Sequence, residues 1–190
     1  MGGWEAFVSE LENAGYFKYA KHTSLEQAKR AIIATKSLFS LDSGTELVGR
    51  VFDGDAERLA EGGVLGFLFQ ISPFLQAQGV SAPVYLDQDF QVGRFAYSVK
   101  VNLDDYVMLA EEEYGEVMAW VAVPARAFAM VNKMLEKRGS RERLYTNQGS
   151  IAQNNLAIFL TPELYDIIRN SPLLSDHDKL LTMGEIAKLF

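Results

Sequence analysis

FAYSVKVNL, residues 95–103, and VMAWVAVP, residues 117–124, are the two stretches that decide the fold class of this chain. In the first stretch every second residue is apolar, and this period of two predicts a strand with one buried face. These residues are Phe95, Tyr97, Val99, Val101 and Leu103. The second stretch is almost continuously apolar over Val117–Val123 and predicts a strand that is covered on both faces. Pro124 then predicts the first turn of a helix, and Gly139 predicts its C-terminal cap.

The other helices are predicted from apolar residues at helical spacing and from residues typical of helix ends. Capping-box spacing at Thr23 and Ser24 predicts a helix over residues 25–39, and Asp55 is expected to cap a short helix. After a break at Gly62-Gly63, a very apolar helix is expected over residues 64–78, with a kink at Pro73. Further helices are expected at residues 4–11, after Thr161, and within residues 175–189.

Strands are also predicted at residues 46–52, 84–86 and 156–160, whereas residues 139–155 have no regular pattern. Several strands follow one another in the middle of the chain without a helix between them. This order predicts an antiparallel or mixed sheet with helices packed on it and with helices at both ends. The length of 190 residues suits one domain, so we expect a single α+β domain over residues 1–190.

The composition argues against several classes of binding partner and against a position in a membrane. The net charge of −7 argues against nucleic-acid binding, which rests on clustered Lys and Arg, and against an anionic membrane surface. The most apolar window, residues 64–75, is shorter than the ~20 residues that cross a bilayer. The chain has no cysteine and no readable secretory signal at its N-terminus, so we expect a soluble, cytoplasmic protein.

No catalytic or cofactor-binding constellation is readable in the sequence. The absence of cysteine excludes disulfides, thiolate nucleophiles and cysteine-based zinc sites. Asp53-Gly54-Asp55 offers two carboxylates that could hold Mg²⁺, but Ala56 and the lack of a second acidic motif favour a turn and a helix cap. His22 and His177 are the only histidines, and neither stands in the context of a catalytic triad. We therefore expect no catalytic residue, no metal and no cofactor, and a binding protein rather than an enzyme.

Charged residues segregate into two segments of opposite sign. Residues 104–116 contain six carboxylates and no Lys or Arg, and residues 133–143 contain five cations and two carboxylates. Such blocks favour contact with a protein partner or self-association; a solvated hairpin tip and a solvated helix face are the alternative interpretation. The candidate partner-binding residues are Glu111, Glu112, Glu113, Arg138, Arg141 and Arg143.

The polar stretch over residues 146–155 carries amides and hydroxyls that can orient a ligand, although a plain surface loop would have the same composition. The candidate ligand-binding residues are Asn147, Gln148, Asn154 and Asn155. The preferred hypothesis is a soluble, non-enzymatic protein-interaction module, similar in composition to small regulatory and immunity proteins. The alternative hypothesis is a small-molecule-binding protein or hydrolase with a pocket of carboxylates and amides beside this stretch.

Overall fold

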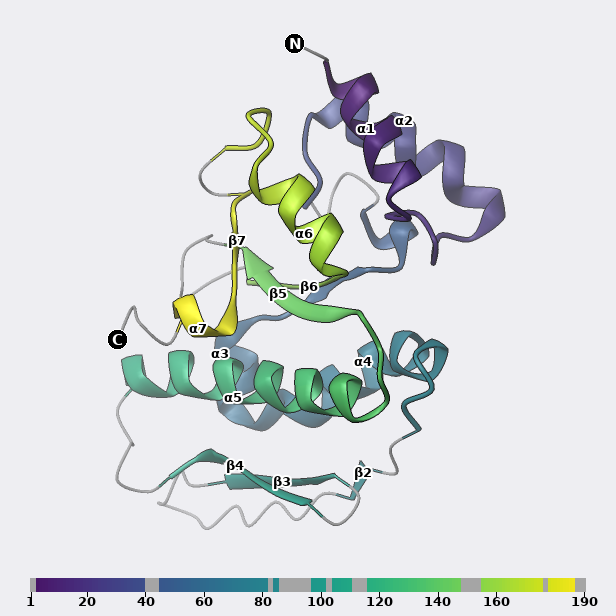
Figure 1. Ribbon diagram of the computed structural model, residues 1–190. Coiled ribbons are helices and arrows are strands. Elements are labelled where there is room, and N and C mark those ends of the chain that lie inside the picture. The colour runs from purple at the N-terminus through teal and green to yellow at the C-terminus, as the bar shows by residue number, and fades with distance from the viewer. Residues whose placement is uncertain are drawn as a thin grey trace.

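Two antiparallel sheets and the helices around them make up the protein, as the computed structural model shows (Figure 1). The structure describes residues 3–39, 45–81, 84–85, 97–101, 104–110, 116–147, 155–175 and 178–186. The larger sheet has the strand order β1-β6-β5-β7, and the smaller sheet has the order β2-β3-β4. The strands are β1 (Val51–Asp53), β2 (Val84–Tyr85), β3 (Tyr97–Val101), β4 (Asp104–Leu109), β5 (Arg143–Asn147), β6 (Leu156–Leu160) and β7 (Leu180–Leu181). This architecture confirms the predicted α+β class.

The helices lie in layers on both sides of the larger sheet. They are α1 (Trp4–Asn13), α2 (Leu25–Thr35), α3 (Ala56–Arg58), α4 (Val64–Ala77), α5 (Glu116–Lys137), α6 (Pro162–Arg169) and α7 (Met183–Ile186). Short turns, η1 (His22–Ser24), η3 (Thr45–Val48) and η4 (Leu59–Gly63), connect some of them. In Figure 1, α1, α2 and α6 lie above the larger sheet, and α3, α4 and α5 lie below it. The smaller sheet lies beyond α5, which contacts both β4 and β5.

Strand β6 lies between two hydrophobic cores, and all five of its residues are buried. Leu156, Ile158 and Leu160 pack into the core beneath α1, α2 and α6. Ala157 and Phe159 point the other way, into the core formed with α4, α5 and the smaller sheet. Successive side chains of a strand point to opposite faces, so a strand between two cores must be apolar at every position. This requirement explains why the short apolar run over residues 156–160 predicts the strand correctly.

The predicted strand over Val117–Val123 is wrong, because these residues belong to α5 and Pro124 lies inside that helix. One sheet lies on each side of α5, so this helix needs apolar residues on two faces (Figure 1). A helix that is apolar on most sides loses its amphipathic period and resembles a buried strand in sequence. The helical period is still visible in the burial, which recurs every four residues at Val123, Ala127, Val131 and Leu135.

Other predicted boundaries also differ from the structure. The strand expected over residues 46–52 is divided between η3 and the short β1, and the helix expected over residues 25–39 ends at Thr35. Ser24 precedes α2 without a side-chain hydrogen bond to it, so the predicted capping box does not form there. Residues 143–147, which have no regular pattern in sequence, form β5, and residues 180–181 form β7 instead of a helix. Both strands acquire their structure by pairing with distant partners.

Several predicted helix ends are confirmed. Helix α4 covers Val64–Ala77 and stops before Gly79, whose φ of +74° suits glycine. The N-terminus of α6 is capped by Thr161, whose Oγ1 accepts a hydrogen bond from the Leu164 N–H at 3.4 Å. Strand β3 buries Val99 and Val101 as its alternation predicts, while Phe95 and Leu103 lie outside the described residues.

Candidate functional site

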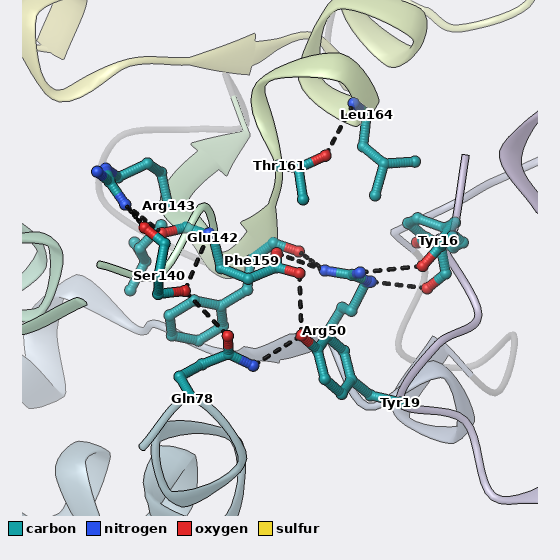
Figure 2. A network of polar contacts seen from close by, with 12 residues as sticks. Tyr16, Tyr19, Arg50, Gln78, Ser140, Glu142, Arg143, Phe159, Thr161 and Leu164 are labelled. Carbon is teal, nitrogen blue, oxygen red and sulfur yellow. Dashed lines mark hydrogen bonds and ion pairs between the residues drawn. The ribbon is translucent and has the colours of Figure 1, made fainter. Parts of the chain in front are cut away.

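A buried ion pair connects Arg50, the residue before β1, to Glu142, the residue before β5 (Figure 2). Arg50 is 1% exposed and Glu142 is 3% exposed. Nη1 of Arg50 donates hydrogen bonds to Oε2 of Glu142 at 2.6 Å and to the Phe159 carbonyl at 2.9 Å. Nε and Nη2 donate to the carbonyls of Tyr16 and Gly15, at 2.7 and 3.0 Å. Each guanidinium nitrogen therefore has an acceptor within the chain.

Polar side chains extend this network to α4 and to the segment after α5 (Figure 2). Tyr19 donates its hydroxyl hydrogen to Oε1 of Glu142 at 3.1 Å, and its ring centroid lies 4.6 Å from the Arg50 guanidinium. Gln78 Nε2 donates to the Tyr19 hydroxyl at 2.7 Å, and the Ser140 hydroxyl donates to Gln78 Oε1 at 2.9 Å. Because the two charged groups are paired and shielded from solvent, we assign this network to holding the fold together rather than to binding.

The Asp53-Gly54-Asp55 sequence forms a turn followed by a helix cap, as predicted. Asp53 Oδ1 accepts a hydrogen bond from the Asp55 N–H at 3.0 Å, and Asp55 Oδ1 accepts one from the Arg58 N–H at 2.7 Å. The Arg58 guanidinium pairs with the second oxygen of Asp53. These contacts give the two carboxylates a structural role, at the edge of a hollow of about 340 Å³ between α3, η4 and α4.

An open groove of about 660 Å³ lies between α1 and α6. Its apolar lining comes from Ala6, Phe7, Ile167, Pro172 and Leu173. Glu10 of α1 and Asp166 of α6 are exposed and also line it, and the described lining residues include no Lys or Arg. The groove therefore combines an apolar floor with an acidic rim, which is the chemistry that suits an apolar ligand carrying positive charge.

The groove between α1 and α6 is not predicted by the sequence. The helical spacing in α1 and α6 does predict which face of each helix packs inward, but not that the two helices are neighbours. They come from opposite ends of the chain and meet on the same side of the larger sheet (Figure 1). The one feature of the sequence that could have indicated the groove is an exposed acidic residue beside the apolar face of each helix, Glu10 in α1 and Asp166 in α6. Many surface helices have this feature, so it is not specific.

The predicted ligand-binding amides lie at the ends of the polar stretch. Asn147 ends β5, and its Oδ1 accepts a hydrogen bond from the Leu156 N–H at 3.0 Å. The Asn155 carbonyl accepts one from the Gly54 N–H at 2.9 Å. Both contacts are with backbone N–H groups, and neither residue lines the α1–α6 groove. Gln148 and Asn154 lie outside the described residues.

The predicted basic surface is partly occupied by contacts within the chain. Arg141 forms an ion pair with Glu163 of α6. Arg143 donates hydrogen bonds to the carbonyls of Ser140 and Glu142, at 2.7 and 2.8 Å. Arg138 is exposed and lines a hollow of about 200 Å³ next to Lys137. The acidic candidates Glu111, Glu112 and Glu113 lie outside the described residues. At the start of the acidic segment, however, Asp104 pairs with Lys137 of the basic segment at 2.6 Å, so the two segments contact each other within the chain there.

Two further observations concern the described part of the chain alone. No group of three or more His, Asp or Glu side chains there is arranged to hold a metal ion. None of the helices in those residues is long and apolar enough to cross a membrane.

Comparison with known proteins adds no relative to this picture. No family model matches the chain, no curated protein matches its sequence, and no solved structure matches its fold. Among the described residues, the α1–α6 groove is the site whose shape and charge point most clearly to a ligand.

Proposed function

We propose that this protein is a protein-binding module that receives a short, apolar and basic segment of a partner in the groove between α1 and α6. The observation that carries the proposal is the combination of an apolar floor with an acidic rim. Apolar side chains of a bound segment would cover Phe7 and Ile167, while its Lys or Arg residues would lie against Glu10 and Asp166. A short amphipathic helix laid in a groove is a common mode of peptide recognition.

The size and charge of the protein support this type of ligand. A volume of about 660 Å³ lies within the ~300–1,000 Å³ typical of ligand sites, and the groove is open to solvent, so a segment of another chain can enter it. The net charge of −7 would attract a positively charged partner over long distances and raise its association rate. A non-enzymatic binding role also requires no catalytic group, cofactor or metal.

A small-molecule or hydrolase function receives less support. It would require a carboxylate and the amides of residues 146–155 to converge on one pocket. The described contacts of Asn147 and Asn155 instead join the ends of this segment to neighbouring backbone.

Selection of random peptides displayed on phage, with the full chain as target, tests the proposed function. We expect enriched peptides to combine apolar residues at helical spacing with Lys or Arg, and to bind with an affinity that falls as salt increases. A Glu10→Lys/Asp166→Lys variant should weaken binding of these peptides at least about tenfold, because it replaces attraction with repulsion at both rims.

A Glu61→Lys/Glu136→Lys variant serves as the matched control, since both residues are exposed, neither lines the groove, and the change in net charge is the same. This control should retain binding to within about twofold at physiological salt, where distant charges are screened. Equal losses in the two variants would indicate non-specific charge attraction and would refute the groove as the binding site. Enrichment of acidic peptides would refute the proposed ligand chemistry.

A further inference from the structure

The outward face of α4 carries no charge and is mainly apolar, with Gln70 and Gln76 as its exposed polar residues. Leu65, Gly66, Phe69, Pro73 and Gln76 follow one another on this face at helical spacing, opposite the buried side of the helix. Phe69 lies at its centre and is 70% exposed. No ionisable residue occurs over residues 62–80, although the whole chain has a net charge of −7. An exposed aromatic residue on an uncharged face is typical of a contact surface.

The hollow between α3, η4 and α4 begins one helical turn away from Phe69. It has a volume of about 340 Å³ and combines an apolar wall, formed by Leu59 and Phe67, with polar residues. The polar lining residues are Asp53, Asp55, Arg58 and Gln70. Gly66 belongs to both features, since it lies on the outward face of α4 and also lines the hollow. A Cβ atom at Gly66 would meet nothing within 4 Å, so the approach to the hollow is open there. Because a cavity of about 150 Å³ can hold benzene, this hollow has room for a phenyl ring.

We propose that two copies of this chain associate through α4, with Phe69 of each copy inserted into the hollow of the other. A protruding ring and a receiving hollow lie next to each other on one surface. A two-fold axis that passes midway between them, perpendicular to the line that joins them, exchanges the two. The contact is therefore self-complementary and closes as a dimer, the most common symmetry of soluble oligomers.

The charges around this surface favour a second copy of the chain as the occupant. Two molecules of net charge −7 repel each other, and this repulsion is smallest where the outward face of α4, which has no ionisable group, forms one side of the contact. On the other side, Asp53 at the hollow is already paired with Arg58. Arg58 stands at the rim of the hollow with its side chain 60% exposed, in position to lie over an incoming aromatic ring. One helix face and one ring bury less than the ~1,600 Å² of a standard interface, so the dimer should be weak and reversible.

Sedimentation velocity of the full chain over a series of concentrations, up to the millimolar range, tests this inference. We expect a reversible monomer–dimer equilibrium with no larger species. Phe69→Ser removes the ring, and Gly66→Leu obstructs the entrance to the hollow; each should weaken dimerisation at least about tenfold. Val107→Ser is the control, because Val107 is also a large apolar residue that is strongly exposed, at 57%, and it lies on β4, away from α4 in the sequence. This control should leave the dimerisation constant unchanged.

Thermal unfolding separates a lost contact from a damaged fold. Gly66→Leu replaces glycine inside an exposed helical turn, so this variant should be at least as stable as the wild type while it dimerises less. A wild-type chain that stays monomeric up to millimolar concentration would overturn the inference. Equal dimerisation by the wild type and the stably folded Gly66→Leu variant would overturn it as well.

Discussion

Arg50 and Glu142 lie 92 residues apart in the sequence and form an ion pair of 2.6 Å, in which their side chains are only 1% and 4% exposed. The pair connects the segment before β1 to the segment before β5, and through the Tyr16 and Phe159 carbonyls it also reaches the end of α1 and β6. Segments from four parts of the chain therefore depend on one guanidinium group.

Removal of one partner of this pair should strongly destabilise the protein. Glu142→Leu leaves the Arg50 charge buried without its counter-ion, which typically costs about 3–5 kcal/mol. An Arg50→Met/Glu142→Leu variant, in which neither charge remains, should recover part of that loss. Urea denaturation of the single and double variants measures both effects.

The exposed pair of Lys137 and Asp104 provides the comparison, because its N–O distance is also 2.6 Å but both side chains are about half exposed. Lys137→Ala should cost much less than Glu142→Leu, since solvent screens this pair. Similar losses in the two variants would contradict the structural role that we assign to burial.

The Arg169–Glu185 pair should make stability depend on pH under acidic conditions. The hydrogen bond from Arg169 and that from the Thr182 N–H lower the pKa of Glu185 to about 2. In the unfolded chain a Glu has a pKa of about 4.3, so the stabilisation is fully present above that pH and disappears as the pH falls toward about 2. Because both side chains are partly exposed, we expect it to contribute about 1 kcal/mol.

Glu185→Gln should therefore be less stable than the wild type at neutral pH and equally stable near pH 2. Denaturant unfolding measured across this range provides the test. Arg169→Gln should reduce the same pH dependence, since it removes the largest cause of the lowered pKa and leaves the hydrogen bond from the Thr182 N–H. A difference between wild type and Glu185→Gln that stays constant with pH would contradict the assignment.

Two glycines three residues apart should respond to alanine in opposite directions. A Cβ at Gly63 would lie 2.4 Å from the Arg58 carbonyl oxygen, so Gly63→Ala must displace backbone and should cost about 1–3 kcal/mol. A Cβ at Gly66 would meet nothing within 4 Å, so Gly66→Ala should stabilise the helix by up to about 1 kcal/mol. Thermal unfolding of the two variants gives the signs, and a stabilising Gly63→Ala would show that the η4 turn can rearrange.

Asn132 of α5 should be needed to hold β5 in place. Its Nδ2 donates to the Leu144 carbonyl at 3.0 Å, and its Oδ1 accepts from the Leu144 N–H at 2.6 Å. Asn132→Ala would leave two partly buried backbone groups without these partners and should cost about 1–3 kcal/mol. Hydrogen exchange at the Leu144 amide should become faster in this variant.

Asn170→Ala is the control for that experiment, because Asn170 donates one hydrogen bond, to the Asp166 carbonyl at 2.8 Å, on an exposed helix end. Its effect should be within about 0.5 kcal/mol of zero. Equal effects of the two substitutions would contradict the role of Asn132 as a support for β5.

The α+β fold class can be predicted from the sequence, whereas the position of the candidate site cannot. The polar stretch over residues 146–155 and the basic segment stand out in sequence because their compositions are unusual. In the structure, Asn147 and Arg141 make contacts within the chain, to Leu156 and Glu163. The α1–α6 groove has no such local signature, because its two walls meet only after the chain has folded around the larger sheet.

Local signals in the sequence are sufficient to predict several elements of the fold. The Thr161 cap and the proline after it define the start of α6, the Asp55 cap defines the start of α3, and the uninterrupted apolar run over residues 156–160 defines β6. Each of these signals acts between residues a few positions apart, so it has the same meaning in any fold. The absence of cysteine likewise excludes whole classes of chemistry without any structure.

The conformation of residues 117–123 and 143–147, and the partner of Arg50, are set by contacts between distant parts of the folded chain. An apolar run is compatible with a strand or a helix, and the two sheets that enclose α5 select the helix. Strand β5 is stabilised by pairing with β6 and β7, and a charge such as that of Arg50 becomes buried only where a distant Glu142 and backbone carbonyls compensate it. These outcomes depend on long-range packing, which a pattern of neighbouring residues does not encode.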